Sequence, residues 1–87
     1  VSGRVVPLDR DKWLTDALRP SFVACGGKAG TARVSLESTY AEIVEVARVD
    51  LGGLKDPLLE RCIGEAAWDL VLPPQFDQEW TTWTVAL

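Results

Sequence analysis

The clearest pattern in the chain is the alternation of apolar and polar residues from Gly30 to Glu37. One side of this segment carries Ala32, Val34 and Leu36, and the other carries Thr31, Arg33, Ser35 and Glu37. A period of two is typical of a strand with one buried face. We therefore predict a central strand over residues 30–37, with helices covering its apolar face.

A second strand is expected over residues 42–49, after a turn at residues 38–40. Its alternation is imperfect because Ile43 and Val44 are adjacent in the sequence. A β-bulge near Val44 and Glu45 would place Ile43 and Val46 on the same face. This segment is therefore predicted to be a bulged partner of the central strand.

The last segment, residues 79–87, alternates again and is the third predicted strand. One face would carry Trp83, Val85 and Leu87, and the other would carry Trp80, Thr82, Thr84 and Ala86. The larger apolar residues of the first set indicate that this set faces the core.

A first helix is predicted between Asp9 or Asp11, either of which can cap its amino end, and Gly26-Gly27, which ends it. Pro20 would either bend this helix or begin a new one. The apolar stripe comprises Trp13, Leu14, Ala17 and Leu18, and it continues through Phe22 and Val23 to Cys25.

A second helix follows the connection at residues 51–54. Asp56 is the expected cap, and Pro57 suits the first helical position because its missing N–H has no intrahelical partner there. Prolines 73 and 74 end the helical region. The predicted buried stripe comprises Leu59, Ile63, Ala66 and Leu70, with Cys62 at its edge.

The predicted order is therefore helix, strand, strand, helix, strand. A hairpin followed by a right-handed crossover places the third strand beside the first. We predict an α+β domain in which two helices pack on one face of a three-stranded antiparallel sheet of order 2-1-3. Residues 1–8 form an arm or the remnant of a linker, and residues 9–87 form the domain. Because the chain begins at Val1 without Met, we expect it to be a piece of a longer or processed protein.

The two cysteines, Cys25 and Cys62, fit either a disulfide or two buried thiols. Their separation does not suit local metal-ligand spacing, and the chain has no histidine to complete a zinc site. A domain of 87 residues buries only a modest core, so a covalent link is favoured. We expect the disulfide, and with it an oxidising compartment.

Charge and composition exclude several classes of function. A net charge of −4 with nine scattered Lys and Arg residues does not provide the basic surface that nucleic-acid binding needs. No apolar run is long enough to span a membrane, so this fragment is not expected to insert. Nothing in the sequence indicates a cofactor.

Catalytic chemistry also finds no support in the sequence. There is no histidine, no phosphate-binding glycine loop and no Ser or Cys beside a plausible base. We therefore predict a protein that is not an enzyme. A carbohydrate-binding module based on Trp80 and Trp83 is weakened because their parity places the two rings on opposite faces.

The remaining tryptophans differ in their expected places. Trp13 and Trp68 lie on or beside helical stripes and are expected in the core or at its rim, and Trp83 is expected in the core. Trp80 either anchors a partner or covers the open face of the sheet.

The chain resembles the TonB C-terminal-like domain, and the resemblance covers roughly residues 13–87. It is closest to the cysteine-containing branch found in gliding-motility envelope proteins and related lipoproteins, in which one Cys closes the first helix and another lies in the second. The resemblance is carried by the runs at residues 18–25, 30–36, 41–46, 59–68 and 72–76.

This resemblance implies a non-catalytic interaction module in the periplasm or cell envelope of a Gram-negative bacterium, with a role in protein transport or motility. Such domains pair an edge strand with a peptide segment of an envelope partner. Here Trp80, Thr82 and Thr84 of the third strand are the candidate contacts. The alternatives for the edge are pairing with a second copy of the chain and an inert edge protected by the chain's own tail. The alternative for the domain as a whole is a disulfide-linked structural domain of a lipoprotein.

Overall fold

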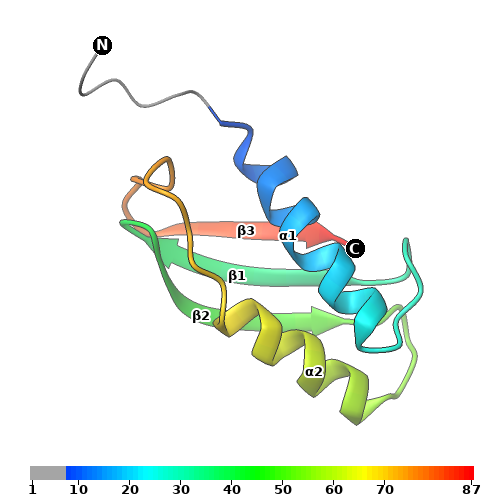
Figure 1. Cartoon of the computed structure of the whole chain (residues 1–87). Coiled ribbons are helices and arrows are strands. Elements are labelled where there is room, and N and C mark those ends of the chain that lie inside the picture. The colour runs from blue at the N-terminus through cyan, green and yellow to red at the C-terminus, as the bar shows by residue number, and fades with distance from the viewer. Residues whose placement is uncertain (1–7) are drawn as a thin grey trace.

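The computed structural model describes residues 8–87 (Figure 1). The predicted arm lies outside this range except for Leu8, which packs against the core. The elements follow the predicted order. They are α1 (Arg10–Ala24), β1 (Arg33–Thr39), β2 (Glu42–Asp50), α2 (Pro57–Trp68) and β3 (Thr81–Ala86).

The three strands form one antiparallel sheet of order β2-β1-β3, as predicted. Both helices lie on the same face, with α2 against β2 and α1 crossing towards β3, while the other face is open (Figure 1). The core lies between the helices and the sheet. At its centre are Val34 and Leu36, which are fully buried, and Ala32, which is nearly so. The predicted parity of the central strand is confirmed.

The cap and the buried stripe of α1 follow from the spacing of its residues. The Asp9 carboxylate accepts a hydrogen bond from the Lys12 N–H at 3.1 Å, so Asp9 is the cap. The buried residues of the helix are Leu14, Leu18 and Phe22. The helix runs without interruption through Pro20. Val23 was expected on the apolar face but is exposed, because it lies one residue past Phe22 and thus about 100° around the helix.

The second helix begins as predicted and buries a slightly different stripe. Asp56 accepts from the Leu59 N–H at 3.0 Å, and Pro57 occupies the first turn. Ala67, rather than Ala66, completes the buried stripe. The neighbouring Trp68 is 50% exposed, which corrects the expectation that it lies in or beside the core.

The other differences in α2 concern the edges of its stripe. Leu70 follows the end of the helix, and both Leu70 and Ala66 are only partly buried against the core. The buried residues Leu59, Ile63 and Ala67 recur every four residues. A stripe with that spacing leaves the flanking positions at the solvent boundary.

The hairpin that joins β1 to β2 is tighter than predicted. The central strand starts at Arg33 and continues to Thr39, so the connection is Tyr40 and Ala41 alone. Both residues have positive φ, at 46° and 65°, as a two-residue hairpin turn requires. Gly30 also has positive φ, at 86°, and lies in the turn before β1 rather than in the strand itself.

Cys25 and Cys62 form the predicted disulfide, with 5.9 Å between their Cα atoms. Cys25 is the residue that ends α1, and Cys62 lies in the middle of α2. The bridge therefore joins the two helices that cover the sheet.

Candidate functional site

The outer edge of β3 is one of the two places where the sheet presents backbone groups to solvent. The Leu87 N–H donates to the Ala32 carbonyl of the chain leading into β1, at 2.9 Å. In an antiparallel ladder, successive residues direct their N–H and C=O groups alternately towards and away from the neighbouring strand. The residues of β3 whose backbone groups point outward are therefore Thr82, Thr84 and Ala86.

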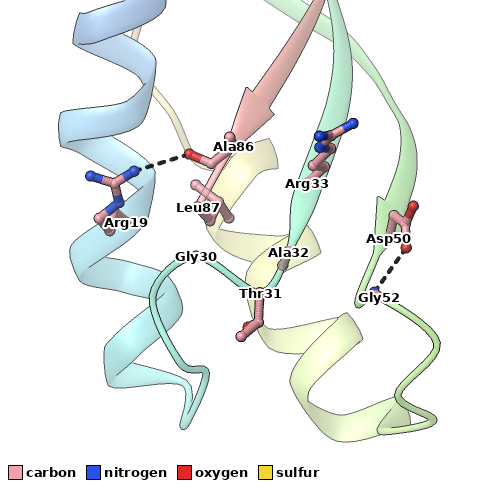
Figure 2. Close-up of a pocket in the computed structure, with 9 residues that line it drawn as sticks. All are labelled: Arg19, Gly30, Thr31, Ala32, Arg33, Asp50, Gly52, Ala86 and Leu87. Atoms are coloured by element: carbon pink, nitrogen blue, oxygen red, sulfur yellow. Dashed lines mark hydrogen bonds between the residues drawn. The ribbon is translucent and has the colours of Figure 1, made fainter.

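Part of this edge is already occupied. The Ala86 carbonyl accepts a hydrogen bond from Nη2 of Arg19 in α1 at 3.4 Å (Figure 2). Within residues 8–87, β3 pairs with β1 alone, so the outward groups of Thr82 and Thr84 serve no other strand. Their side chains are exposed on the open face. The structure thus brings two of the sequence-predicted residues together at an unpaired edge.

Trp80, the third candidate, lies beside this edge but outside the strand. The strand was expected to begin at Glu79 and instead begins at Thr81. Trp80 is 62% exposed, and its Nε1 donates to Oε1 of Glu37 at 2.6 Å. Because Glu37 belongs to the side of β1 that faces away from the core, the ring of Trp80 lies towards the open face.

Trp83 lies on the other side of the sheet. Its ring packs edge-on against Phe76 with 5.4 Å between the centroids, and Phe76 makes the same type of contact with Trp13. Its Nε1 donates to the buried Ser38 hydroxyl at 2.8 Å. Trp80 and Trp83 therefore do not form a common aromatic surface.

The outer edge of β2 is irregular. Its register with β1 shifts twice, and these shifts leave Val44 and Ala47 without a partner residue in β1. The bulge at Val44 was predicted from the adjacent Ile43 and Val44, whereas the bulge at Ala47 was not. Bulges bend a strand and interrupt the spacing of its outward groups, so this edge is a poor template for a further strand.

Two arginines, which the sequence analysis did not single out, flank the end of β3. Arg19 comes from α1 and Arg33 from β1, and both border a hollow of about 340 Å³ beside Ala86 and Leu87 (Figure 2). Arg33 is the register partner of Ala86, so its side chain shares the open face with the Ala86 methyl group. Sequence patterns place each arginine on a face but do not show that the two faces meet here.

In residues 8–87 there is no group of three or more His, Cys, Asp or Glu side chains placed to hold a metal ion. In the same range, neither helix has the length and apolar character that crossing a membrane requires.

Comparison with known proteins finds no matching family model, no matching curated protein and no matching solved structure. The functional interpretation therefore rests on the exposed edge of β3 and the side chains around it.

Proposed function

We propose that this domain is a non-catalytic protein-interaction module of the cell envelope, which binds an extended segment of a partner protein at the outer edge of β3. The observation that carries the proposal is the regular strand whose outward N–H and C=O groups at Thr82 and Thr84 pair with no other strand within residues 8–87. An extended peptide can add to such an edge as a further strand, with the backbone supplying affinity and the side chains supplying specificity.

The contrast with β2 supports this choice of edge. The bulges of β2 protect it in the way that natural sheets commonly protect their edges. The register of β3 with β1 is unbroken from Ala86 to Thr81. A partner strand would therefore find regularly spaced hydrogen-bonding groups at β3 alone.

The proposed location rests on the disulfide and on the family resemblance. A bridge between Cys25 and Cys62 is compatible with an oxidising compartment such as the periplasm. The resemblance to TonB C-terminal-like domains supports an envelope partner.

A peptide library displayed on phage would test the proposal. Peptides selected on the wild-type domain should bind the Thr84→Ala variant, which keeps the backbone N–H, and should lose binding to Thr84→Pro, which lacks it. Trp80→Ala should weaken binding by about 1 kcal/mol or more if the ring anchors the peptide.

The outcomes separate the alternatives. Peptides that bind Thr84→Pro as tightly as wild type would show that β3 is not the docking edge. A folded domain that selects no peptide would favour a purely structural role. Dimerisation of the wild type that is lost in Thr84→Pro would assign the edge to a second copy of the chain.

A further inference from the structure

We infer that a second copy of the chain docks on the outward side of α2, with the two α2 helices antiparallel and related by a two-fold axis. The contact surface is the outer row of α2, which comprises Leu58, Arg61, Glu65 and Trp68. The inference goes beyond strand addition at β3 and does not depend on it.

The outer row has the spacing of a helix surface that meets another helix. Its members are separated by three, four and three residues, as the a and d positions of a coiled coil are. It lies opposite the buried stripe of α2, because Arg61 and Glu65 are each about 200° around the helix from the buried Ile63. All four residues of the row are exposed, and Figure 1 shows α2 at the outside of the molecule.

The two ends of the outer row are apolar although they face solvent. Leu58 is 80% exposed, and half of the Trp68 side chain is accessible. Leu54 and Val71, which flank the helix, are exposed as well. Exposed apolar side chains that gather on one helix indicate a surface for association, since removing them from water is favourable.

The outer row is self-complementary about Ile63. Leu58 and Trp68 lie five residues before and after Ile63, and Arg61 and Glu65 lie two residues before and after it. Two antiparallel helices that cross at this level bring Leu58 of each copy to Trp68 of the other, and Arg61 to Glu65, as an isologous contact requires. A parallel pair in register would instead place like charges together, which is unfavourable.

Gly64 allows the two helices to approach closely. It lies inside α2, where glycine is less favourable than alanine, and on the helix surface it adjoins Arg61 and Trp68. A Cβ atom added here would meet nothing within 4 Å, so packing within residues 8–87 does not require a glycine. In the two-fold arrangement, Gly64 of both copies lies on the same flank of the contact, where its small size lets the backbones come together.

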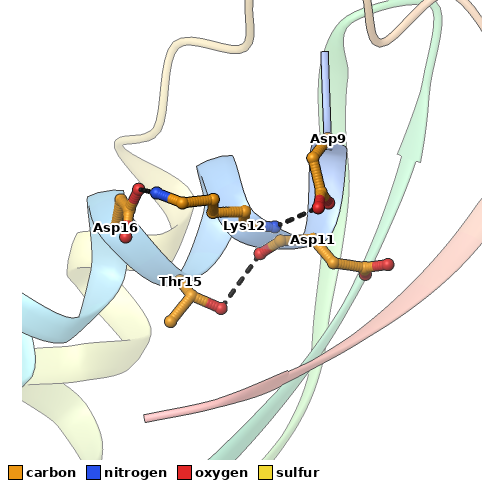
Figure 3. A network of polar contacts seen from close by, with 5 residues as sticks. All are labelled: Asp9, Asp11, Lys12, Thr15 and Asp16. Carbon is orange, nitrogen blue, oxygen red and sulfur yellow. Dashed lines mark hydrogen bonds and ion pairs between the residues drawn. The ribbon is translucent and has the colours of Figure 1, made fainter.

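The exposed side of α1 offers a comparison, because it carries a row with the same spacing. Lys12 and Asp16 form an ion pair at the middle of this row, at 2.5 Å (Figure 3), as Arg61 and Glu65 do in α2, at 3.3 Å. The hydrogen bond and the negative charge of Asp16 raise the pKa of Lys12, which keeps the pair ionised. The row of α1 comprises Asp9, Lys12, Asp16 and Arg19.

The rows of the two helices differ at their ends. In α1 both ends are charged and bonded within the chain, since Asp9 accepts from the Lys12 N–H and Arg19 donates to the Ala86 carbonyl. In α2 both ends are apolar and exposed. A second copy would therefore gain little at α1, whereas at α2 it would bury a leucine and a tryptophan from each chain.

The contact is small and leaves the candidate edge free. α2 has 12 residues and is thus about 18 Å long. Two such helices form an interface of the small, transient class, below about 1,200 Å² in total, so we expect a dissociation constant on the order of 0.1 mM. The outer edge of β3 remains open, because α2 packs against β2 at the other side of the sheet.

Sedimentation equilibrium of the whole chain, from about 10 µM to about 1 mM, tests the inference. The wild type should pass from monomer to dimer over this range. Arg61→Glu and Glu65→Arg should each remain monomeric, because like charges then meet between the helices. An equal mixture of these two variants should dimerise again, since an acidic row then faces a basic one. A monomeric wild type, or a mixture that stays monomeric, would overturn the inference.

Lys12→Glu is the matched control because it makes the same change of charge in the ion pair of α1. It should dimerise as the wild type does, and an equal loss would show a general charge effect and overturn the assignment to α2. Trp68→Ala should weaken the dimer about tenfold with little change in the thermal unfolding temperature. Unchanged dimerisation of Trp68→Ala would overturn the proposed contact of this ring with leucine.

Two further variants test the position of the contact. Gly64→Gln introduces a better helix former into open space, so it should raise the thermal unfolding temperature while weakening the dimer. Dimerisation of Gly64→Gln at the wild-type level would overturn the close approach of the helices. Dimerisation that survives Arg61→Glu but is lost in Thr84→Pro would place the second copy at the β3 edge and overturn the contact at α2.

Discussion

The two edge strands of the sheet pair with the same central strand in different ways. The register of β3 with β1 is continuous from Ala86 to Thr81, whereas that of β2 shifts twice along its length. α2 packs against β2, while α1 crosses towards β3 and projects past it (Figure 1). The bulged strand is thus poorly suited to further pairing, and the regular strand keeps outward groups beneath an overhanging helix.

This difference shows that a small sheet can have bulges along one edge strand and a regular backbone along the other. Bulges at Val44 and Ala47 twist β2 and break the spacing of its outward groups. β3 gains no such protection from its own pairing. Within residues 8–87, the Arg19 side chain reaches this edge and bonds to the Ala86 carbonyl at the strand's end.

The sharpest test of the contrast compares proline at two neighbouring positions of β3. Val85→Pro removes an N–H directed at β1 and a buried side chain, so it should cost about 3 kcal/mol or more and unfold the domain. Thr84→Pro removes an outward N–H and should cost only about 1 kcal/mol. Urea unfolding followed by tryptophan fluorescence measures both, with Val85→Ala separating the loss of packing. Similar losses in the two proline variants would show that the outward set is wrongly assigned.

The disulfide joins α1, which contacts β3, to α2, which contacts β2. Its removal tests how far the stability of the domain depends on this link. Cys25→Ala/Cys62→Ala should lower the free energy of unfolding by about 2–5 kcal/mol, because the unfolded chain is no longer constrained by the loop. Urea unfolding gives this value. Thiol titration of the unfolded, unreduced wild type should find no free thiol, and two thiols per chain would contradict the bridge.

Leu36 lies on the central strand, where its register partners are Val46 of β2 and Trp83 of β3. Leu36→Ala should cost about 2–5 kcal/mol through lost contacts and a residual cavity. Arg33→Ala, on the open face, should change stability by no more than about 0.5 kcal/mol. Thermal and urea unfolding of both variants provide the comparison. A larger effect at Arg33 would reverse the assignment of the faces.

The smallest effect is expected at the turn that leads into the bulged strand. Ala41 has φ of 65°, which a residue with a side chain adopts at a cost. Ala41→Gly should therefore raise stability by about 0.5 kcal/mol, the relief of strain being partly offset by the greater freedom of glycine in the unfolded chain. Ala41→Val is the opposing control and should destabilise the domain, since β-branched residues tolerate positive φ poorly. A stabilising valine would contradict the strained turn.

The sequence predicted features that depend on neighbours along the chain. The alternation of Ala32, Val34 and Leu36 identified the buried face of the central strand. Asp56 was recognised as a cap, and Asp9 as one of two candidates beside Asp11, because capping involves residues within one turn. The adjacency of Ile43 and Val44 was sufficient to predict one bulge. The order of the helices and strands followed from these elements, and the disulfide was favoured because the core is small.

Other expectations failed where the burial of a side chain depends on a small rotation around a helix, or where pairing depends on a one-residue change of strand register. Trp68 was expected at the core, but the stripe of α2 passes through Ala67 and leaves the tryptophan half exposed. The bulge at Ala47 left no signal, because it arises from how β2 meets β1. The tight turn at Tyr40 and Ala41 likewise depends on β1 extending to Thr39.

The candidate site also combines features that local sequence predicts with features that only tertiary contacts determine. Periodicity alone placed Thr82 and Thr84 on one face of the last strand, since side-chain direction alternates within a single strand. The direction of their N–H groups depends on which residues of β1 they oppose, and this register is set by contacts between segments far apart in the sequence. Only the tertiary structure places Arg19 of the first helix and Arg33 of the first strand on either side of the last strand's end, because the crossing of α1 over the sheet is decided by packing in the shared core.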